Sequence, residues 1–350
     1  MKRKYRVLLI GSSSPHIANH LSRIEGSEFI VAVVSNDNKF LNKNQTFYRV
    51  NFSLKNPLNW IMSPKKIDEI IREFNPDVIH VHQANSIGLY SVLGNKKNQK
   101  PIALTVLGSD ILINPKKNFI YREILKYILR NVDVITSDSI YMADIIRDLY
   151  CIKNKEIEIC NFGVNEYDII INKKKIIYSN RMHNPLYRID EIVKAFARFK
   201  ECDNTEDWIL KIAGVGSETE NLKKLANDLK IENSLEFLGF VDSKENSKLY
   251  AESTFFISIP KSDATSISLL ESMYYKCVPI LSDLPANREW VKSGWNGLIV
   301  EDLSSNYILE AIKFYNDKIG MINRSIIMEK ATINKSKENF RNVLLKIIKN

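Results

Sequence analysis

The sequence predicts an α/β protein of two doubly wound, Rossmann-like domains in tandem, followed by an amphipathic C-terminal helix. Short apolar runs alternate with stretches of helical periodicity, which is typical of strand–helix–strand units with a parallel sheet. The alternation stops near the middle of the chain and then starts again. A length of 350 residues suits two domains of ordinary size, and 45% hydrophobic with 26% charged residues is typical of globular chains.

The first domain is expected over residues 1–165, with six strands and intervening helices. Its strands are expected at Val7–Ile10, Phe29–Val34, Val78–Val81, Ile102–Val106, Val132–Thr136 and Glu156–Cys160. Its clearest helical patterns are at Pro64–Phe74, Phe119–Arg130 and Ile140–Tyr150. The polar segment Asn161–Lys174, which contains Gly163, is expected to link this domain to the next.

The second domain is expected over residues 166–330 and repeats the pattern. Its strands are expected at Lys175–Tyr178, Trp208–Ala213, Leu235–Phe237, Phe255–Ile259, Val278–Leu281 and Gly297–Val300. Its helices are expected at Asp190–Lys200, Glu218–Asp228, Lys244–Ala251, Ser266–Tyr275 and Ser304–Asn316. Residues 331–350 form a last helix whose apolar face is expected to pack back on the first domain. Ligands of open α/β sheets bind beyond the carboxyl ends of the strands, so the two domains are expected to face each other across a cleft.

The cysteines and the N-terminus indicate a cytoplasmic protein. Cys151, Cys160, Cys202 and Cys277 follow no zinc or redox spacing and are expected to be reduced thiols. The apolar run Val7–Ile10 is too short for a secretory signal, and no stretch is long enough to span a membrane.

The net charge of +9 lies almost entirely in the first half. Residues 1–165 hold 23 Lys and Arg against 15 Asp and Glu. This excess indicates an anionic partner, and we expect peripheral attachment to the inner face of the cytoplasmic membrane. A merely lysine-rich, solvated surface is the alternative. Nucleic acid is not an expected partner, because no nucleic-acid-binding motif accompanies the charge.

The segment Phe255–Trp295 carries the most specific chemical pattern. A strand is followed by the small, hydroxyl-rich turn Ser262–Ser266 and then by a helix. A Ser or Thr of this turn can cap the helix, and the free backbone N–H groups at the helix N-terminus can bind phosphate. Asp263 precedes the helix and Glu271 falls within it. A phosphate site flanked by two carboxylates is one interpretation, and an ordinary capped helix with solvated acids is the other.

This segment resembles the donor site of family 4 retaining glycosyltransferases, which have the two-domain GT-B fold. The form S-D-x-T-S-x-S-L-L-E-x-M is matched by Ser262–Met273, and P-I-x-S-D-x-P-x-N-R-E-W by Pro279–Trp290. The resemblance implies that Glu271 binds the ribose hydroxyls of a nucleotide and that Asp263 lies near the transferred sugar. The first acid of the family is usually Glu and is Asp in this chain. The backbone around the turn would hold the diphosphate, with Thr265, Ser266 and Ile267 as the expected residues.

The same resemblance implies two cations that neutralise the leaving diphosphate. Arg181 matches the first, and Arg188 is the best substitute for the second, although Arg188 could instead pair with Asp190 or Glu191 at the surface. The turn after the second strand and a neighbouring loop would line the nucleotide, with Gly214, Gly216 and Gly239 as the expected residues.

Three loops of the first domain are expected to face the acceptor. They follow strands, and their candidate residues are Gly11, Ser12, His16, His82, Ser109 and Asp110. For each histidine a structural hydrogen bond is the alternative, and for Asp110 a structural role in its loop. The chain has no D-x-D triplet, which metal-dependent glycosyltransferases usually carry. We therefore expect no metal and no cofactor.

The sequence thus predicts a retaining, metal-independent hexosyltransferase. Its donor would be a nucleotide-diphospho-sugar, and its acceptor a hydroxyl of a glycan or of a glycan on polyprenyl diphosphate. Assembly of capsule, O-antigen, lipopolysaccharide or exopolysaccharide is the expected setting. Two alternatives remain: a non-catalytic, nucleotide-binding scaffold subunit of a glycan-assembly complex, and a sugar-nucleotide epimerase.

Overall fold

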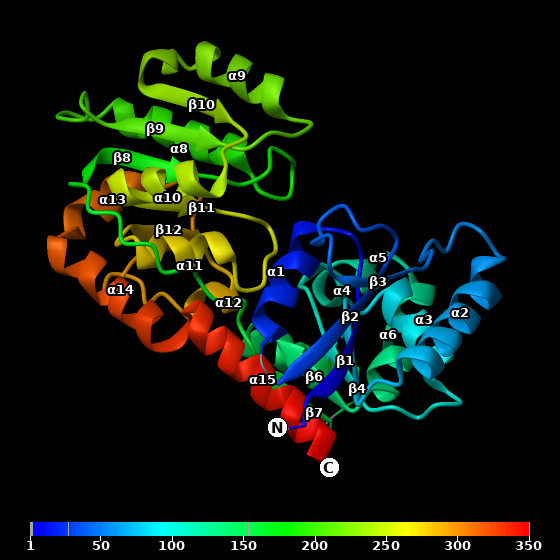
Figure 1. Ribbon diagram of the computed structural model, residues 1–350. Coiled ribbons are helices and arrows are strands. Elements are labelled where there is room, and N and C mark those ends of the chain that lie inside the picture. The colour runs from blue at the N-terminus through cyan, green and yellow to red at the C-terminus, as the bar shows by residue number, and fades with distance from the viewer. Residues whose placement is uncertain (1–2, 27, 151, 153–154, 350) are drawn as a thin grey trace. The chain divides into compact units, whose positions relative to one another are not determined.

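The computed structural model describes residues 3–26, 28–150, 152 and 155–349. Two compact units make up the chain: residues 1–162 with 334–350, and residues 163–333. Each unit is a parallel sheet with helices on both faces (Figure 1). The prediction of two doubly wound α/β domains with a C-terminal helix is confirmed.

The first unit contains a seven-stranded sheet of order β3-β2-β1-β4-β5-β6-β7. Its strands are β1 (Tyr5–Ile10), β2 (Phe29–Ser35), β3 (Thr46–Arg49), β4 (Val78–His82), β5 (Ile102–Thr105), β6 (Val134–Ser137) and β7 (Glu156–Ile159). Its helices are α1 (Pro15–Ile24), α2 (Asn59–Phe74), α3 (Ser86–Asn95), α4 (Ser109–Leu112), α5 (Asn114–Lys117), α6 (Phe119–Arg130), α7 (Ile140–Leu149) and α15 (Ile333–Lys349). Right-handed crossovers place α1 on one face of the sheet and α2, α3 and α6 together on the other.

The second unit contains a six-stranded sheet of order β10-β9-β8-β11-β12-β13. Its strands are β8 (Lys174–Ser179), β9 (Ile209–Ala213), β10 (Leu235–Gly239), β11 (Ser253–Ser258), β12 (Val278–Ser282) and β13 (Leu298–Val300). Its helices are α8 (Ile189–Lys200), α9 (Thr219–Asp228), η1 (Glu232–Ser234), α10 (Ser243–Glu252), α11 (Ile267–Tyr274), α12 (Pro285–Arg288), α13 (Tyr307–Phe314) and α14 (Asp317–Lys330). One apolar core lies under α8, α9 and α13, and a second lies under α10, α11 and α14.

The central strands are buried along their whole length, as both faces of a parallel sheet must be. Every residue of β4, β11 and β12 is buried. The strand order reverses between β1 and β4 in the first sheet and between β8 and β11 in the second. At such a switch point the two flanking loops diverge and leave room for a ligand at the carboxyl edge of the sheet. Each unit therefore offers one such position.

Several elements differ from the sequence analysis, which also did not predict the short helices η1 and α12. The edge strand β3 lacks an apolar run and was not predicted. Helix α2 begins at Asn59, five residues before its expected start at Pro64. Helix α14 was missed because Gly320 and Asn323 interrupt its buried face. Gly320 packs on the backbone of Lys276, where a Cβ would lie 2.5 Å from the carbonyl oxygen.

The segment expected to link the domains is tied to the second unit near its end. The ammonium of Lys173 donates to the carbonyl oxygens of Tyr250, Ser253 and Tyr275 at 2.9, 2.6 and 2.7 Å. Burial lowers the pKa of this ammonium. Three carbonyl acceptors offset the cost of burying the charge, so Lys173 fixes the entry into β8.

The structure also bears on the cysteines and on the length and apolar character of the helices. Cys160, Cys202 and Cys277 are free thiols, and Cys151 lies outside the described residues. Within the described ranges, no helix combines the length and the apolar character that crossing a bilayer requires.

Three buried histidines connect α1, β4 and α15 in the first unit. His20 Nε2 lies 3.2 Å from His80 Nδ1, and the rings of His20 and His82 stack at 4.9 Å. Phe340 of α15 packs edge-on against His20, with ring centroids 4.6 Å apart. Burial lowers the pKa of His80 and of His82 to about 3, and the pKa of His20 falls well below its usual value. All three rings are therefore neutral at physiological pH.

These histidines should make the stability of the first unit sensitive to acid. Their pKa values are lower in the folded than in the unfolded state, so their contribution is complete above about pH 6.5 and is lost as the pH falls toward 3. Each histidine contributes a slope of about 1.4 kcal/mol per pH unit in this window. We predict that His20→Phe flattens the fall in unfolding free energy between pH 6.5 and 5.5 by about 1 kcal/mol, measured by urea unfolding. An unchanged slope would contradict this account.

Candidate donor site

The switch point of the second sheet brings Arg181 and Asp263 together. Arg181 follows β8 and Asp263 follows β11, which are neighbours in the sheet although 82 residues separate the two side chains. Arg181 Nη2 lies 2.6 Å from Asp263 Oδ2 in a largely buried ion pair. The guanidinium also lies over the ring of Tyr187, 4.4 Å from its centroid. Burial raises the pKa of Asp263, and Arg181 opposes that rise.

The same guanidinium reaches the N-terminus of α11. Arg181 Nη1 donates to Ser266 Oγ at 2.5 Å. Ser266 occupies the N-cap position of α11, but its side chain does not bond a backbone amide of the helix. The first backbone N–H groups of a helix have no partner within it and carry partial positive charge. The guanidinium of Arg181, paired with Asp263, thus lies at the start of α11, whose first helical residue is Ile267.

Glu271 lies on α11, one turn further into the helix. Asn246 of α10 donates its side-chain amide to Glu271 Oε2 at 3.4 Å, and the hydroxyl of Tyr250 also bonds the carboxyl group. Burial raises the pKa of Glu271 to about 7, although Tyr250 opposes the rise. At neutral pH this carboxyl group therefore exists in both its protonated and its charged form. Hydroxyl groups that donate to it would favour the charged form.

The predicted glycines bring neighbouring loops into close contact. Gly214 donates its N–H to the carbonyl oxygen of Gly239 at 2.7 Å. A Cβ on Gly214 would lie 2.5 Å from the carbonyl oxygen of Arg181, and one on Gly216 would lie 2.2 Å from that of His183. Only glycine fits at these two positions. They hold the loop that carries Arg181 against the end of β9.

Arg188 stabilises the strand end that precedes the hydroxyl-rich turn. Its Nε donates to the carbonyl oxygen of Ile259 at 2.7 Å, and its Nη2 donates to that of Pro260 at 3.0 Å. Neither Asp190 nor Glu191 pairs with it, since both bond Lys194. The guanidinium is therefore engaged with backbone carbonyls rather than held free for an anion.

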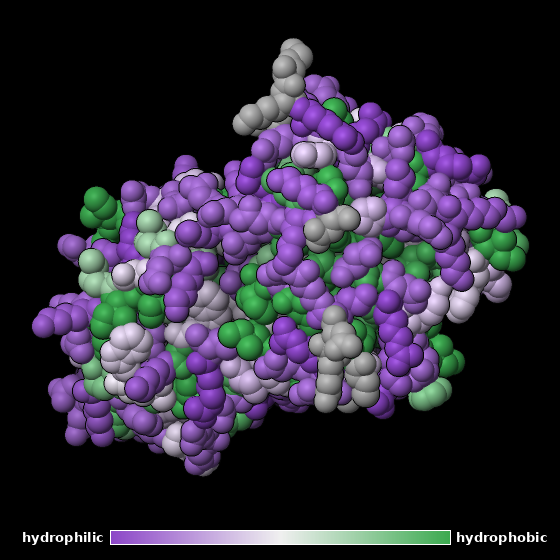
Figure 2. Space-filling view, turned by 90° about the horizontal axis from the view of Figure 1, so that it is seen from below, coloured by the Kyte–Doolittle hydropathy of each residue, from purple (hydrophilic) through white to green (hydrophobic). Residues whose placement is uncertain are grey.

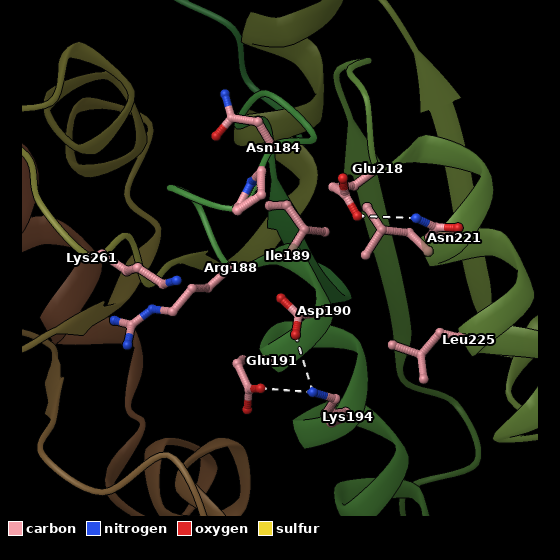
Figure 3. A pocket seen from close by; sticks show the side chains of 12 residues that line it. Asn184, Arg188, Ile189, Asp190, Glu191, Lys194, Glu218, Asn221, Leu225 and Lys261 are labelled. Atoms are coloured by element: carbon pink, nitrogen blue, oxygen red, sulfur yellow. Dashed lines mark hydrogen bonds and ion pairs between the residues drawn. The ribbon is translucent and has the colours of Figure 1, made fainter.

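A pocket of about 460 Å³ borders Arg188 and is also lined by the cations of Lys194 and Lys261. Lys261 lies beside Arg188 at one edge, and Lys194 with its two carboxylate partners lies at another (Figure 3). The side chain of Lys261 is exposed and makes no hydrogen bond or ion pair with any residue that the structure describes. The sequence analysis missed Lys261. It directly precedes the turn Ser262–Ser266, and this position was the available signal.

The predicted residues of the first unit lie at or just beyond the carboxyl ends of β1, β4 and β5, in the loop after β1, at the last position of β4 and in the first turns of α1 and α4. Gly11 is buried against Ile17 and His82, and a Cβ there would lie 2.4 Å from Ile17 Cδ1. His82 belongs to the buried histidine cluster. Ser12 is half-buried, and His16 and Ser109 are exposed.

Asp110 has a structural position between two of these loops. It is buried, and its carboxylate accepts the N–H groups of Ala84 and Leu107 at 2.8 and 2.9 Å. Burial raises the pKa of Asp110 against these hydrogen bonds. Ser109 beside it is exposed and is the more accessible of the two, and its hydroxyl donates to the carbonyl oxygen of Leu107 at 3.4 Å.

Two family models match the chain. The model of glycosyl transferases group 1 matches residues 165–327, and that of the glycosyl transferase 4-like family matches residues 6–139. The two matches together span most of the chain, which belongs to the glycosyltransferases that these models describe. The first match contains the switch point with Arg181, Asp263 and Glu271.

Curated relatives of this glycosyltransferase agree with the family assignment. An uncharacterized glycosyltransferase of Methanocaldococcus jannaschii is 27% identical over 314 residues, covering 87% of this chain and 84% of the relative. An alpha-monoglucosyldiacylglycerol synthase of Streptococcus pneumoniae is 22% identical over 239 residues, covering 59% of this chain and 51% of the relative.

Solved structures share the fold over nearly the whole length. A glycosyltransferase from Rickettsia africae has a TM-score of 0.81 at 19% identity, covering 99% of both chains. An Anabaena protein solved in complex with UDP-glucose has a TM-score of 0.75 at 12% identity, covering 98% of this chain and all of the other. The glycosyltransferase thus has the GT-B fold.

Of the cations at the pocket, Arg188 and Lys261 should differ in how much they contribute to stability. We predict that Arg188→Ala lowers the unfolding free energy of the second unit by about 2–4 kcal/mol, because two charge-assisted hydrogen bonds are lost and their buried acceptors remain. Lys261→Ala should change it by less than about 0.5 kcal/mol, because that ammonium is exposed. Urea unfolding of both variants checks this difference, and equal destabilisation would show that the contacts of Arg188 are unimportant.

Proposed function

We propose that the protein is a retaining, metal-independent hexosyltransferase that takes its sugar from a nucleotide-diphospho-sugar. The arrangement of Arg181, Asp263 and Ser266 at the start of α11 carries the proposal. It joins a fixed guanidinium to a helix N-terminus, and both favour a diphosphate. The Anabaena protein of the same fold, solved with UDP-glucose, supports a donor of this class.

Each residue of the site has a role in the proposed donor complex. Arg181 and the first amides of α11 bind the diphosphate, with the exposed ammonium of Lys261 as a further candidate cation. Glu271 accepts hydrogen bonds from the two ribose hydroxyls. The loop Gly214–Gly216 and Gly239 line the nucleotide. Asp263, which orients Arg181, lies toward the transferred sugar and acts on its hydroxyls.

The proposed reaction needs no nucleophile from the protein. The bond between the anomeric carbon and the diphosphate oxygen breaks, and the acceptor oxygen bonds the same carbon on the same face. The acceptor proton passes to the departing diphosphate oxygen. Arg181 stabilises the negative charge that develops on the diphosphate, which is the largest electrostatic demand of this step.

The proposed acceptor is a hydroxyl of a glycan, free or carried on polyprenyl diphosphate, in the assembly of a surface polysaccharide. The alpha-monoglucosyldiacylglycerol synthase relative supports an acceptor that is attached to a lipid. The basic first half of the chain supports a peripheral position on an anionic membrane. Ser12, His16 and Ser109 are the accessible candidates for contact with the acceptor.

A thermal-shift panel with UDP, GDP, ADP, dTDP and CMP in EDTA tests the donor site. We predict that one base is preferred, with stabilisation on the order of 2.7 kcal/mol at a hundredfold excess over the dissociation constant. Glu271→Ala should abolish this shift. Because ribose hydroxyls favour the charged form of Glu271, whose pKa is about 7, the affinity should be full at pH 8 and fall by up to about tenfold per pH unit below pH 7.

The matched control is Glu206→Ala. It removes an exposed glutamate from the turn before β9, at the amino ends of the strands, whereas the donor site lies at their carboxyl ends. This variant should keep the full nucleotide shift. If no nucleotide stabilises the wild type, or if Glu271→Ala retains the shift, the assignment of the donor site is wrong.

A further inference from the structure

The first unit exposes large apolar side chains at the beginnings of two helices. Trp60, Ile61 and Met62 at the start of α2 are 45%, 60% and 60% exposed. Phe119 and Ile120 at the start of α6 are 72% and 62% exposed. Isolated apolar residues are normal on a surface, but five from two adjacent helix ends are not. Figure 2 shows the face seen from below in Figure 1, where hydrophilic side chains predominate and apolar side chains form scattered green areas.

A shallow apolar pocket joins the two helix ends. It has a volume of about 350 Å³ and is formed by Trp60 of α2, two leucines of α3 and four residues of α6, with Glu123 at its margin. Its lining includes Phe119, Ile120 and Tyr127. We call these exposed side chains and this pocket the apolar surface.

Lysines surround the apolar surface. Lys116 and Lys117 end α5, and Asn118 alone separates them from α6. Lys65 and Lys66 lie on α2, and all four lysines are exposed. The ammonium of Lys96, at the end of α3, lies 5.8 Å from the ring centroid of Tyr127. Neither helix has an acidic residue in its first turn. Glu123 is the acid at the margin, and Lys126 pairs with it at 2.9 Å.

The apolar surface lies toward the edge of the sheet that carries the acceptor loops. Crossover helices run antiparallel to the strands, so α2 and α6 begin near the carboxyl ends of β3 and β5. Ser12 and Ser109 follow β1 and β5 at that same edge. A partner bound to the apolar surface would therefore adjoin the candidate acceptor residues.

We infer that the apolar surface inserts into the interfacial region of an anionic phospholipid bilayer. Trp, Phe and Ile side chains with flanking lysines are the combination that anchors peripheral proteins in the headgroup layer. The apolar residues supply burial and the lysines supply attraction to anionic lipid. The membrane binding itself does not depend on the proposed function. Only its biological purpose, which is to bring the protein to a lipid-linked acceptor, rests on that function.

The test is co-sedimentation of the whole protein with vesicles of phosphatidylcholine, alone or mixed with phosphatidylglycerol. Wild type should bind the mixed vesicles, and added salt should weaken that binding. The double variant Phe119→Ser with Ile120→Ser should bind at least about tenfold more weakly. Lys116→Glu with Lys117→Glu should lose a similar factor on mixed vesicles and change little on phosphatidylcholine.

Matched controls lie in the second unit. Phe240→Ser removes a phenyl ring that is 82% exposed, and Lys244→Glu with Lys248→Glu reverses two exposed charges on α10. Both should bind vesicles like wild type. The inference is overturned if wild type does not bind mixed vesicles, or if these controls lose as much as the apolar-surface variants.

Two further readouts keep the interpretations apart. If the Phe119 and Ile120 variant instead loses a dimer seen by light scattering, the surface binds a second copy and the membrane inference is wrong. The nucleotide thermal shift should persist in every apolar-surface variant. Its absence in wild type would contradict the proposed function while leaving the vesicle result valid.

Discussion

The donor site depends on one interaction, the contact of the Arg181 guanidinium with both Asp263 and Ser266. It joins the loop after β8 to the turn before α11 across the point where the strand order reverses. Asp263 holds the cation in place at the electrostatic cost of a buried charge, as its raised pKa indicates. The glycines around it follow from the same constraint, because the backbone of Arg181 and His183 packs where Cβ atoms of Gly214 and Gly216 would lie.

At this site, some side chains hold the backbone in place and others are available to bind a ligand. Arg188 uses its donors on the carbonyls of Ile259 and Pro260, so it fixes the path of the chain into the turn. The ammonium of Lys261 lies next to it, has no partner among the described residues and is available to an anion. Glu271, half-buried and hydrogen-bonded by Asn246 and Tyr250, has a pKa raised to about 7, so its protonated and charged forms coexist at neutral pH.

The sequence predicted the strands well because buried parallel strands are short, continuous apolar runs, as in β4 and β11. It missed α14 because Asn323 uses its side chain to bond the carbonyl oxygens of Cys277 and Asn296, a long-range network with no local pattern. For the same reason it could not show that His82 lies in a buried cluster with His20 and Phe340, which are distant in sequence. The residues of the turn before α11 were found because they are contiguous. The pairing of Arg181 with Asp263 and the role of Arg188 could be recognised only from the three-dimensional structure, because the partners are distant in sequence.

The central claim is that Arg181 stabilises a nucleoside diphosphate as it leaves a sugar. The most direct measurement is release of nucleoside diphosphate from a panel of nucleotide sugars, in EDTA, with a lipid extract of the source cells as acceptor. The account predicts release from donors of one nucleotide, reduced by about a hundredfold or more in Arg181→Ala, as expected for loss of a group that stabilises transition-state charge. Release that is unchanged in Arg181→Ala, or that occurs only when a divalent metal is added, would contradict it.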